Sequence, residues 1–320
     1  MFMRINETLV NGEPMSTFQL GERKRRKTMI THLRSERGEL FNSPDTIEHH
    51  LQHYFSELYG AGDVEEEAGE AFGCARIVPE NDEVNAETMS EITTAEIFSA
   101  IKTSAPKKSP GSDGLPREFY LRTFDVIHRE LNLVLNEALS TNFPPEFVDG
   151  VIVLVKKKGG DDTARSFRPI SLLNFDYKIL ARVLKIRIER VMHAHQILSA
   201  GQKCSNSDRN IFQATLALKD RIVELTRRGR KGKLVSFDLD HAFDRVDRRF
   251  LFRTMRSLGF NIALVNLLSR IAEDSSSRLM VNGHLSPAFS IRRSVRQGDP
   301  LSMHFFFFSV VPEVNNSFFS

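Results

Sequence analysis

The run 234–244, which reads LVSFDLDHAFD, constrains the fold more than any other part of the sequence. It opens with apolar, strand-forming residues and then places aspartates at positions 238, 240 and 244. Apolar residues next recur at spacings of roughly three to four as far as Leu258, and Gly259 is a typical helix stop. The pattern predicts a buried strand, an acidic turn and a helix that starts near Phe243.

The aspartates of this run have two interpretations. A strand that delivers a carboxylate to its end can hold a hard divalent cation such as Mg²⁺, which binds one or two carboxylates together with substrate phosphates. Aspartates at the start of a helix also cap it and interact favourably with its dipole. Spacing alone favours neither interpretation.

Charge is distributed unevenly along the 320 residues. Residues 101–320 contain 35 Lys and Arg against 22 Asp and Glu, a balance of +13, whereas residues 1–100 contain 9 against 19, a balance of −10. The basic part is where a polyanion is expected to bind. The alternative is a solvated surface of mixed charge.

Composition indicates a globular protein, with 41% hydrophobic and 27% charged residues. The two cysteines, Cys74 and Cys204, lack metal-ligand spacing and fit a reducing compartment. The start of the chain lacks a signal-peptide pattern, and the longest apolar run, 305–311, is too short to span a bilayer. We expect a soluble intracellular protein of the cytoplasm or nucleus, without membrane contact.

Periodicity predicts helices over 45–60, 117–140, 177–198, 210–226 and 262–271, with a linker over 60–90. Apolar strands at 151–155 and 167–173 predict a β-hairpin whose tip carries lysines 156–158, and Asn282-Gly283 predicts a second hairpin. A core strand has no need of Arg168, which stands between apolar residues and before Pro169. The helix 177–198 is expected to present a positive face formed by Lys178, Arg182, Lys185, Arg187 and Arg190.

Four blocks in this order resemble the reverse transcriptases of non-LTR, LINE-type retrotransposons. They are SPGSDGLPREFY at 109–120, FRPISLLN at 167–174, SFDLDHAFDRV at 236–246 and RQGDPLS at 296–302. The resemblance implies an α+β fold, the right hand of a polymerase, with fingers and a partial palm of antiparallel sheet and packed helices. Its expected parts are a helical leader and acidic linker over 1–89, fingers over 90–233 and palm over 234–320.

The resemblance also implies roles for single residues. Asp238 matches the first catalytic, metal-binding aspartate, and the Leu239 carbonyl would face the same ion. Phe243 matches the residue that excludes a ribose 2′-hydroxyl, and Arg168 matches an arginine over the triphosphate. Gln297 and Gly298 match the loop that lines the incoming nucleotide. The implied partners are an RNA template, a DNA primer and deoxynucleoside triphosphates, and the implied cofactor is a pair of Mg²⁺ ions.

The sequence departs from that family in one important respect. The family's remaining metal ligands lie in an aromatic-Ala-Asp-Asp hairpin, but no Asp-Asp pair follows residue 162 and only Glu313 is acidic beyond Asp299. We therefore expect a truncated copy, an incomplete two-metal site and no polymerase activity from these 320 residues.

Two other functions compete with the polymerase. One is a non-enzymatic nucleic-acid-binding remnant. The other is a haloacid-dehalogenase-type phosphatase, because the run FDLDH at 237–241 resembles that family's opening motif. In that case Asp238 would be the nucleophile and Asp240 the acid/base.

Overall fold

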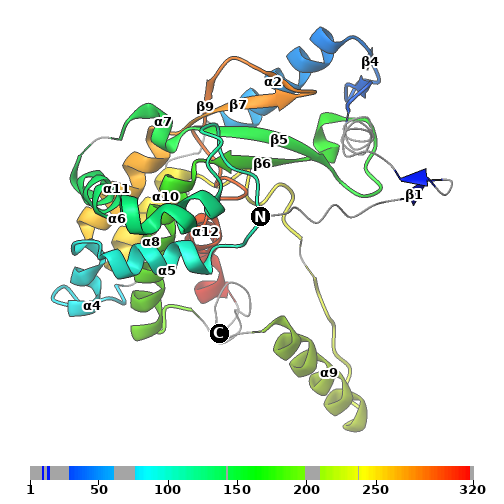
Figure 1. The fold of residues 1–320 in the computed structure, drawn as a ribbon. Helices are drawn as coiled ribbons and strands as arrows, with labels where there is room; N and C mark the ends of the chain where they lie inside the picture. The colour runs from blue at the N-terminus through cyan, green and yellow to red at the C-terminus, as the bar shows by residue number, and fades with distance from the viewer. Residues whose placement is uncertain are drawn as a thin grey trace.

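The computed structural model describes residues 9–10, 13–14, 29–60, 76–141, 143–198, 210–236 and 238–317, with the side chains of 9–10, 13–14, 145 and 311–317 left aside. A mixed β-sheet is packed against a set of helices (Figure 1). The chain thus has the expected α+β fold. Outside the main sheet, β1 (Leu9–Val10) pairs with β2 (Glu13–Pro14), and β3 (Leu33–Arg34) pairs with β4 (Leu40–Phe41).

The main sheet is centred on strand β5 (Gly150–Lys156). Strand β6 (Phe167–Leu173) pairs with β5 in antiparallel fashion over its whole length, as the hairpin prediction required. The other edge of β5 pairs in parallel with β7 (Ser276–Val281), so the sheet is mixed, although an antiparallel sheet was expected. Both edges of β5 are therefore occupied, and the strand order is β6-β5-β7-β8.

The second predicted hairpin is also confirmed. β7 continues into β8 (His284–Leu285) through Asn282 and Gly283, whose φ angles are +51° and +94°. Two positive φ values are typical of the type I′ turn that Asn-Gly favours. β9 (Phe289–Ser290) pairs with the start of the same strand, β7.

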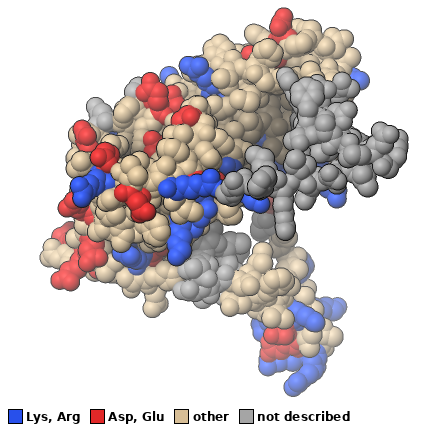
Figure 2. Space-filling model, viewed as in Figure 1, with Lys and Arg blue, Asp and Glu red and all other residues tan. Residues whose placement is uncertain are grey.

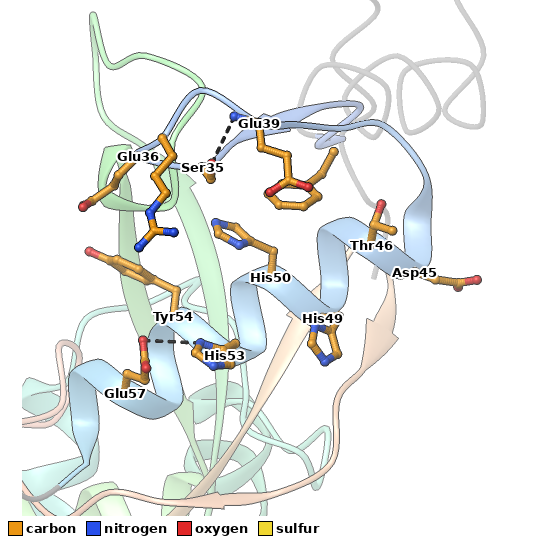
Figure 3. A pocket seen from close by; sticks show the side chains of 12 residues that line it. Ser35, Glu36, Glu39, Asp45, Thr46, His49, His50, His53, Tyr54 and Glu57 are labelled. Carbon is orange, nitrogen blue, oxygen red and sulfur yellow. Dashed lines mark hydrogen bonds and ion pairs between the residues drawn. The ribbon is translucent and has the colours of Figure 1, made fainter.

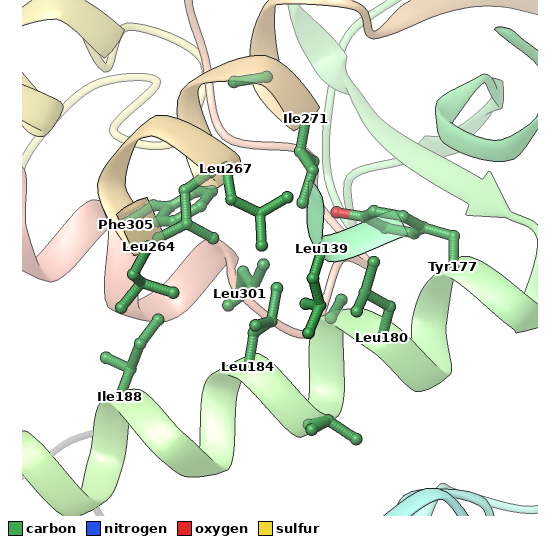
Figure 4. Close-up of a cluster of buried hydrophobic side chains, with 14 of the residues drawn as sticks. Leu139, Tyr177, Leu180, Leu184, Ile188, Leu264, Leu267, Ile271, Leu301 and Phe305 are labelled. Carbon is green, nitrogen blue, oxygen red and sulfur yellow. The ribbon is translucent and has the colours of Figure 1, made fainter. Parts of the chain in front are cut away.

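The main core lies among the long helices. α8 (Phe175–Ala194) contributes Leu184 and Ile188, which face Leu264 and Leu267 of α11 (Ile262–Glu273) in Figure 4. The other helices around this core are α5 (Thr94–Thr103), α6 (Arg117–Ser140), α7 (Pro145–Val148), α10 (Arg248–Leu258) and α12 (Ser302–Ser317).

A second core lies beneath helix α2 (Pro44–Tyr59), the predicted leader helix. Ser43 caps this helix by accepting a hydrogen bond from the Thr46 N–H at 3.3 Å. Leu51 and Phe55 pack with residues of the sheet, among them Ile152 and Leu279. The leader is thus part of the folded body, because its apolar stripe covers one face of the sheet.

Residues 76–89, which lie within the expected linker, also join the body. They contain α4 (Glu83–Ala86) and the 3₁₀ helix η1 (Glu87–Met89), and Val78 is fully buried. The Leu258 carbonyl at the end of α10 accepts hydrogen bonds from the N–H groups of Ile77 and Val78. Residues 61–75 lie outside the described residues.

The strand predicted at the start of the run 234–244 was wrong. Residues 234–236 form no strand, and Leu234 and Val235 are 69% and 65% exposed. Helix α10 begins at Arg248 rather than near Phe243, since the Asp247 side chain caps it by accepting from the Phe250 N–H at 2.8 Å. Residues 234–236 pair with none of the described strands of the main sheet, whose order is β6-β5-β7-β8.

The positive face predicted for helix 177–198 is wrong for Arg187, whereas Arg190 is exposed as expected. Arg187 is buried and forms a bidentate ion pair with Glu96 of α5, with both N–O distances at 2.9 Å. Lys185 forms an ion pair with Glu189, and Arg182 donates to the Thr103 carbonyl. Arg182, Lys185 and Arg187 thus contact other parts of the folded chain.

Helix α9 (Ile211–Arg227) lies apart from the rest of the body in Figure 1. Asn210 caps it by accepting from the Phe212 N–H at 3.0 Å. None of its residues is buried, and several of its apolar side chains, such as Leu216 and Ile222, are at least half exposed. The predicted helix is thus confirmed, but it contributes nothing to the core.

Asp176, near the start of α8, makes the stability of the fold depend on pH. Burial, with a smaller contribution from Asp113, raises the pKa of this carboxyl to about 6. Because the folded state holds the proton more tightly, the stability from this group is complete below about pH 4 and is lost as the pH rises through 6.

We predict that Asp176→Asn stabilises the chain by roughly 2–3 kcal/mol at pH 7.5 and changes little at pH 4, measured by urea unfolding. Asp161→Asn is the control of opposite sign, because hydrogen bonds from Ser166 and Thr163 lower the pKa of Asp161 to about 2. That variant should be less stable than the wild type at pH 7.5. Equal stability of Asp176→Asn and wild type at pH 7.5 would contradict the prediction.

Candidate functional site

The acidic run forms an irregular turn whose aspartates have different environments. Asp238 and Leu239 are exposed, and no described residue pairs with the Asp238 carboxylate. The Asp240 carboxylate, in contrast, lies 2.7 Å from the Arg165 guanidinium and 3.6 Å from that of Arg245. The hydrogen bond from Arg165 keeps the pKa of Asp240 below its usual range.

Asp244 lies on the inner side of the same turn and is 3% exposed. The Tyr59 hydroxyl donates to one of its oxygens at 3.3 Å, and Nδ1 of His241 lies 3.1 Å from the other. His241 has a φ of +52°, which is uncommon for a residue with a side chain, and its carbonyl accepts from the Asp244 N–H at 2.9 Å. The turn is therefore held from inside while Asp238 faces solvent.

The donor atoms of this turn suit a hard cation to a limited extent. The Asp238 carboxylate and the Leu239 carbonyl are oxygen ligands of the kind that Mg²⁺ takes. Asp240 and Asp244 are engaged elsewhere, and the described residues contain no cluster of three or more His, Cys, Asp or Glu side chains arranged to hold a metal. The turn thus offers one free carboxylate.

Arg168 stands on the exposed side of β6. Burial alternates along the strand, with Phe167 and Pro169 inward, so that Arg168 points the other way. It pairs in register with Val155 of β5, which is 49% exposed. No described residue forms an ion pair with its guanidinium, which leaves it available for an anionic ligand.

The loop that carries Gln297 and Gly298 lies against the same strand. The Gln297 carbonyl accepts a hydrogen bond from the Ser171 N–H at 2.8 Å. Gly298 has a φ of +115°, and a Cβ built on it would lie 2.7 Å from the Ser171 carbonyl oxygen. Only glycine fits this approach without strain.

A buried polar group supports this loop from below. Arg296 and Asp299 form an ion pair at 2.9 Å, with both side chains 5% exposed. The Tyr177 hydroxyl donates to Asp299 at 2.5 Å, and the Arg296 guanidinium lies 4.9 Å from the centre of the Tyr177 ring. Burial and the nearby Asp299 raise the pKa of Tyr177 well above its usual range, so the phenol stays protonated and donates.

Backbone hydrogen bonds connect this loop to the acidic turn. The Val295 N–H donates to the Phe243 carbonyl at 2.9 Å, and the Ser294 N–H donates to the Val246 carbonyl at 2.8 Å. The Phe243 ring is half-buried and stacks on Phe306 of α12 at a centroid distance of 5.1 Å. The fold thus places Phe243, Gln297 and Gly298 in adjoining segments.

The other candidate residues are joined to this group less directly. Arg168 shares strand β6 with Ser171, which contacts the Gln297 loop. Asp238 is linked only through its turn, where the Asp240–Arg165 ion pair reaches the 3₁₀ helix η2 (Ala164–Ser166) just before β6. No contact between described residues joins the Arg168 and Asp238 side chains directly.

Unpaired positive charge is concentrated at the last residue of α9 and in the segment that follows it. Arg227, Arg230, Lys231 and Lys233 are exposed, and none of them pairs with an acidic side chain among the described residues. Figure 2 shows Lys and Arg side chains around the separate α9 region. At the tip of the β5–β6 hairpin, Lys156 forms an ion pair with Asp162 at 2.7 Å.

A cavity of about 850 Å³ lies elsewhere, between α2 and the β3–β4 hairpin. Figure 3 shows His50 and Tyr54 pointing from α2 toward the hairpin. His50 stacks on Phe41 at 4.5 Å, and burial lowers the pKa of its imidazole. The candidate residues on β6, the acidic turn and the Gln297 loop do not line this cavity.

Sequence reasoning missed Tyr59 and Tyr177 as parts of the site, and it did not predict that Asp244 pairs with Tyr59. Tyr59 is separated from Asp244 by 185 positions, so no local pattern connects them. Asp299 and Arg296 flank Gln297 and Gly298 in the quoted motif, and this adjacency was the available signal for a supporting pair.

Comparison with known proteins identifies the domain. Residues 155–312 match the family model of reverse transcriptase (RNA-dependent DNA polymerase). The chain is 28% identical over 297 residues to the transposon TX1 uncharacterized 149 kDa protein of Xenopus laevis, covering 92% of this chain and 22% of that protein. It is 30% identical over 229 residues to the Pol polyprotein of the type-1 retrotransposable element R2 of Popillia japonica, covering 71% and 31%.

The chain therefore carries a reverse transcriptase domain. More particularly, it is the reverse transcriptase domain of a non-LTR, LINE-type retroelement. The chain spans less than a third of the length of these two relatives. A solved chain titled "Partial Cas6-RT-Cas1--Cas2 complex" gives a TM-score of 0.40 at 13% identity, over 73% of this chain and 34% of that one, a likeness too low to define a fold.

No helix among the described residues is both long and apolar enough to cross a bilayer.

We predict that Gly298→Ala destabilises the chain more than Gly114→Ala does. Both glycines have positive φ, which costs a non-glycine residue about 1–2 kcal/mol, but a Cβ at Gly114 meets nothing within 4 Å. At Gly298 the new methyl group also meets the Ser171 carbonyl, which should add about 1–3 kcal/mol. Chemical unfolding of the two variants measures the difference, and equal losses would show that the loop does not lie on β6.

Proposed function

We propose that this chain supplies the nucleotide-binding part of an RNA-directed DNA polymerase that copies an RNA template from a DNA primer. The observation that supports this most is the backbone connection between Val295 and Phe243. It sets the segment that bears Gln297 beside the turn that bears Asp238. These segments come from separate motifs, and only the fold brings them next to β6.

Each candidate residue contacts a different part of the bound deoxynucleoside triphosphate. The Arg168 guanidinium, exposed and without an ion-pair partner, neutralises phosphate charge. The backbone of the loop that contains Gln297 and Gly298 lies close to the nucleotide, because Gly298 has no side chain that would keep it away. Phe243 lies beside the sugar, where its ring leaves no room for a 2′-hydroxyl, and its stacking on Phe306 keeps the ring in place.

Asp238 and the Leu239 carbonyl would hold Mg²⁺ in this arrangement. When bound, two such ions stabilise the attacking and leaving oxygens of an in-line phosphoryl transfer. Asp238 supplies one carboxylate, whereas Asp240 is retained by two arginines and Asp244 by Tyr59. Residues 1–320 alone are therefore expected to bind nucleotide weakly and to extend no primer, because Mg²⁺ keeps its waters unless most ligands are present.

The phosphatase alternative requires Asp240 to act as a general acid. A general acid must carry a proton near neutral pH. Arg165 instead lowers the pKa of Asp240, so this carboxyl is ionised and cannot donate. The local electrostatics therefore favour the polymerase over the phosphatase.

A nucleic-acid-binding protein without turnover is the second candidate. It is favoured by the cations near the end of α9 that lack an ion-pair partner among the described residues, namely Arg227, Arg230, Lys231 and Lys233, and by the single free carboxylate of the acidic turn. Such a protein would retain the electrostatic attraction to phosphates that also serves the polymerase.

We predict that the chain binds a 20-nucleotide RNA without sequence preference and that the affinity falls steeply with salt, because phosphate contacts release counterions. Arg230→Ala/Lys231→Ala should weaken binding and lower the slope of log K against log salt by about one to two. Arg221→Ala/Arg228→Ala is the matched control, since both arginines pair with Glu224. Fluorescence anisotropy measures all three proteins, and salt-independent binding would contradict the phosphate interface.

We also predict that Mn²⁺ and dTTP bind together at Asp238. Mn²⁺ takes the same oxygen ligands as Mg²⁺ and is detected by electron paramagnetic resonance. Asp238→Asn should weaken this binding by about tenfold, the range seen when metal sites lose a supporting group. Phe243→Val should raise the affinity for UTP relative to dTTP by about tenfold, as a pocket that admits one more small group does.

The two variants of this experiment have separate contrary outcomes. If Asp238→Asn binds Mn²⁺ and dTTP as tightly as the wild type does, Asp238 is not a metal ligand. A parallel fall of UTP and dTTP affinity in Phe243→Val would make Phe243 a packing residue only.

A further inference from the structure

The last residue of helix α2 forms a hydrogen bond with the acidic turn. Tyr59 is 4% exposed and ends α2, and its hydroxyl donates to Asp244. Burial, together with the Asp244 carboxylate, raises the pKa of this phenol well above its usual range. The phenol is therefore a permanent donor at physiological pH, and Asp244 is its acceptor.

The same end of α2 also holds the segment that leads to Gln297. The Tyr59 carbonyl accepts from the N–H groups of Arg292 and Arg293, at 3.0 and 3.3 Å. The Arg293 guanidinium donates to the Leu58 carbonyl at 2.6 Å. The last carbonyl groups of a helix lack partners within the helix. These hydrogen bonds supply donor partners at the end of α2 and also hold residues 292–293 in place.

The two contacts converge on one structure. Residues 294 and 295 pair with the backbone of Val246 and Phe243, while Tyr59 contacts the segment before them and the Asp244 side chain beside them. The ring of Tyr59 is positioned by Phe289, at 6.3 Å and nearly parallel, and by Phe55 at 6.1 Å. The hydroxyl is thus aimed by a rigid aromatic stack.

The turn needs such support because its own geometry is strained. His241 adopts a φ of +52° without being glycine, and such a conformation persists only where the surroundings enforce it. The buried Asp244 carboxylate, paired with the Tyr59 hydroxyl and next to His241 Nδ1, provides that enforcement. Asp238 and Phe243 lie on either side of His241 in the sequence, so the orientation of their side chains depends on the backbone conformation of His241.

We propose that Tyr59 of the leader helix is a positioning residue for the nucleotide site and that its hydroxyl, through Asp244, sets the conformation of the turn that presents Asp238 and Phe243. The predicted effect of Tyr59 on metal and nucleotide binding rests on the proposed function. The structural part of the inference stands on the hydrogen bonds alone. It gives the leader, which lies outside the matched region 155–312, a direct part in the site.

The test compares Tyr59→Phe with Tyr54→Phe in the 320-residue chain. Each variant removes one phenolic oxygen from α2 and keeps its ring, but only Tyr59 hydrogen-bonds to the turn. Hydrogen exchange resolved to peptides reports on the turn 241–246 and on α8 as an internal reference. Binding of Mn²⁺ with dTTP reports on the site.

We expect Tyr59→Phe to speed exchange in 241–246 and to weaken Mn²⁺–dTTP binding, each by about tenfold, as for other groups that orient a ligand. Exchange in α8 should be unchanged, and Tyr54→Phe should match the wild type in both measurements. If Tyr59→Phe also matches the wild type in both measurements, the inference is wrong and the proposed site is unaffected.

The remaining outcomes separate the two proposals. If the wild type shows no Asp238-dependent binding while exchange in 241–246 still rises in Tyr59→Phe, the proposed function fails and the control of the turn by Tyr59 stands. If α8 and the turn lose protection together, Tyr59 supports the whole fold, and the specific positioning role is wrong.

Discussion

The structure depends on the burial of arginine side chains that must find hydrogen-bond acceptors. Among the described residues, Arg187, Arg248 and Arg296 are buried, and a buried guanidinium without partners costs several kcal/mol. Arg248 meets no carboxylate; it donates to the carbonyls of Ala272, Ile291 and Ser294. Burial lowers the pKa of Arg248 to about 9, which leaves it charged at neutral pH, so those three segments must stay in place around it.

These buried cations connect the framework to the site. Arg296 joins Asp299 and the Val148 carbonyl beneath the Gln297 loop, and Arg248 fixes the segment that pairs with the acidic turn. Other arginines and lysines are exposed: Arg168, Arg230, Lys231 and Lys233 have no acidic partner among the described residues. Buried arginines thus stabilise the fold, and a separate set of exposed cations is available to bind phosphate. This division suits a polymerase domain, which must bind a polyanion while its own structure stays unchanged.

Local patterns predicted the elements whose causes are local. The β5–β6 hairpin and helix α8 follow from alternation and periodicity, and the exposed position of Arg168 follows from its place on a pleated strand. The errors concern partners distant in sequence. Residues 234–236 pair with no described strand although their composition favours one. Arg187 is a buried cation rather than a surface one because it pairs with Glu96, which lies 91 positions away in the sequence. The contact of Tyr59 with Asp244 likewise joins residues that are distant in the sequence.

The central claim is that the acidic turn, β6 and the Gln297 loop together form one nucleotide site. Photoaffinity labelling with 8-azido-dATP in the presence of Mn²⁺, followed by peptide mass spectrometry, tests it most directly. The account predicts that the label falls on peptides from 167–173, 238–246 or 295–299 and is displaced by excess dATP. Displaceable labelling confined to residues 35–57, around the cavity between α2 and the β3–β4 hairpin, would contradict it.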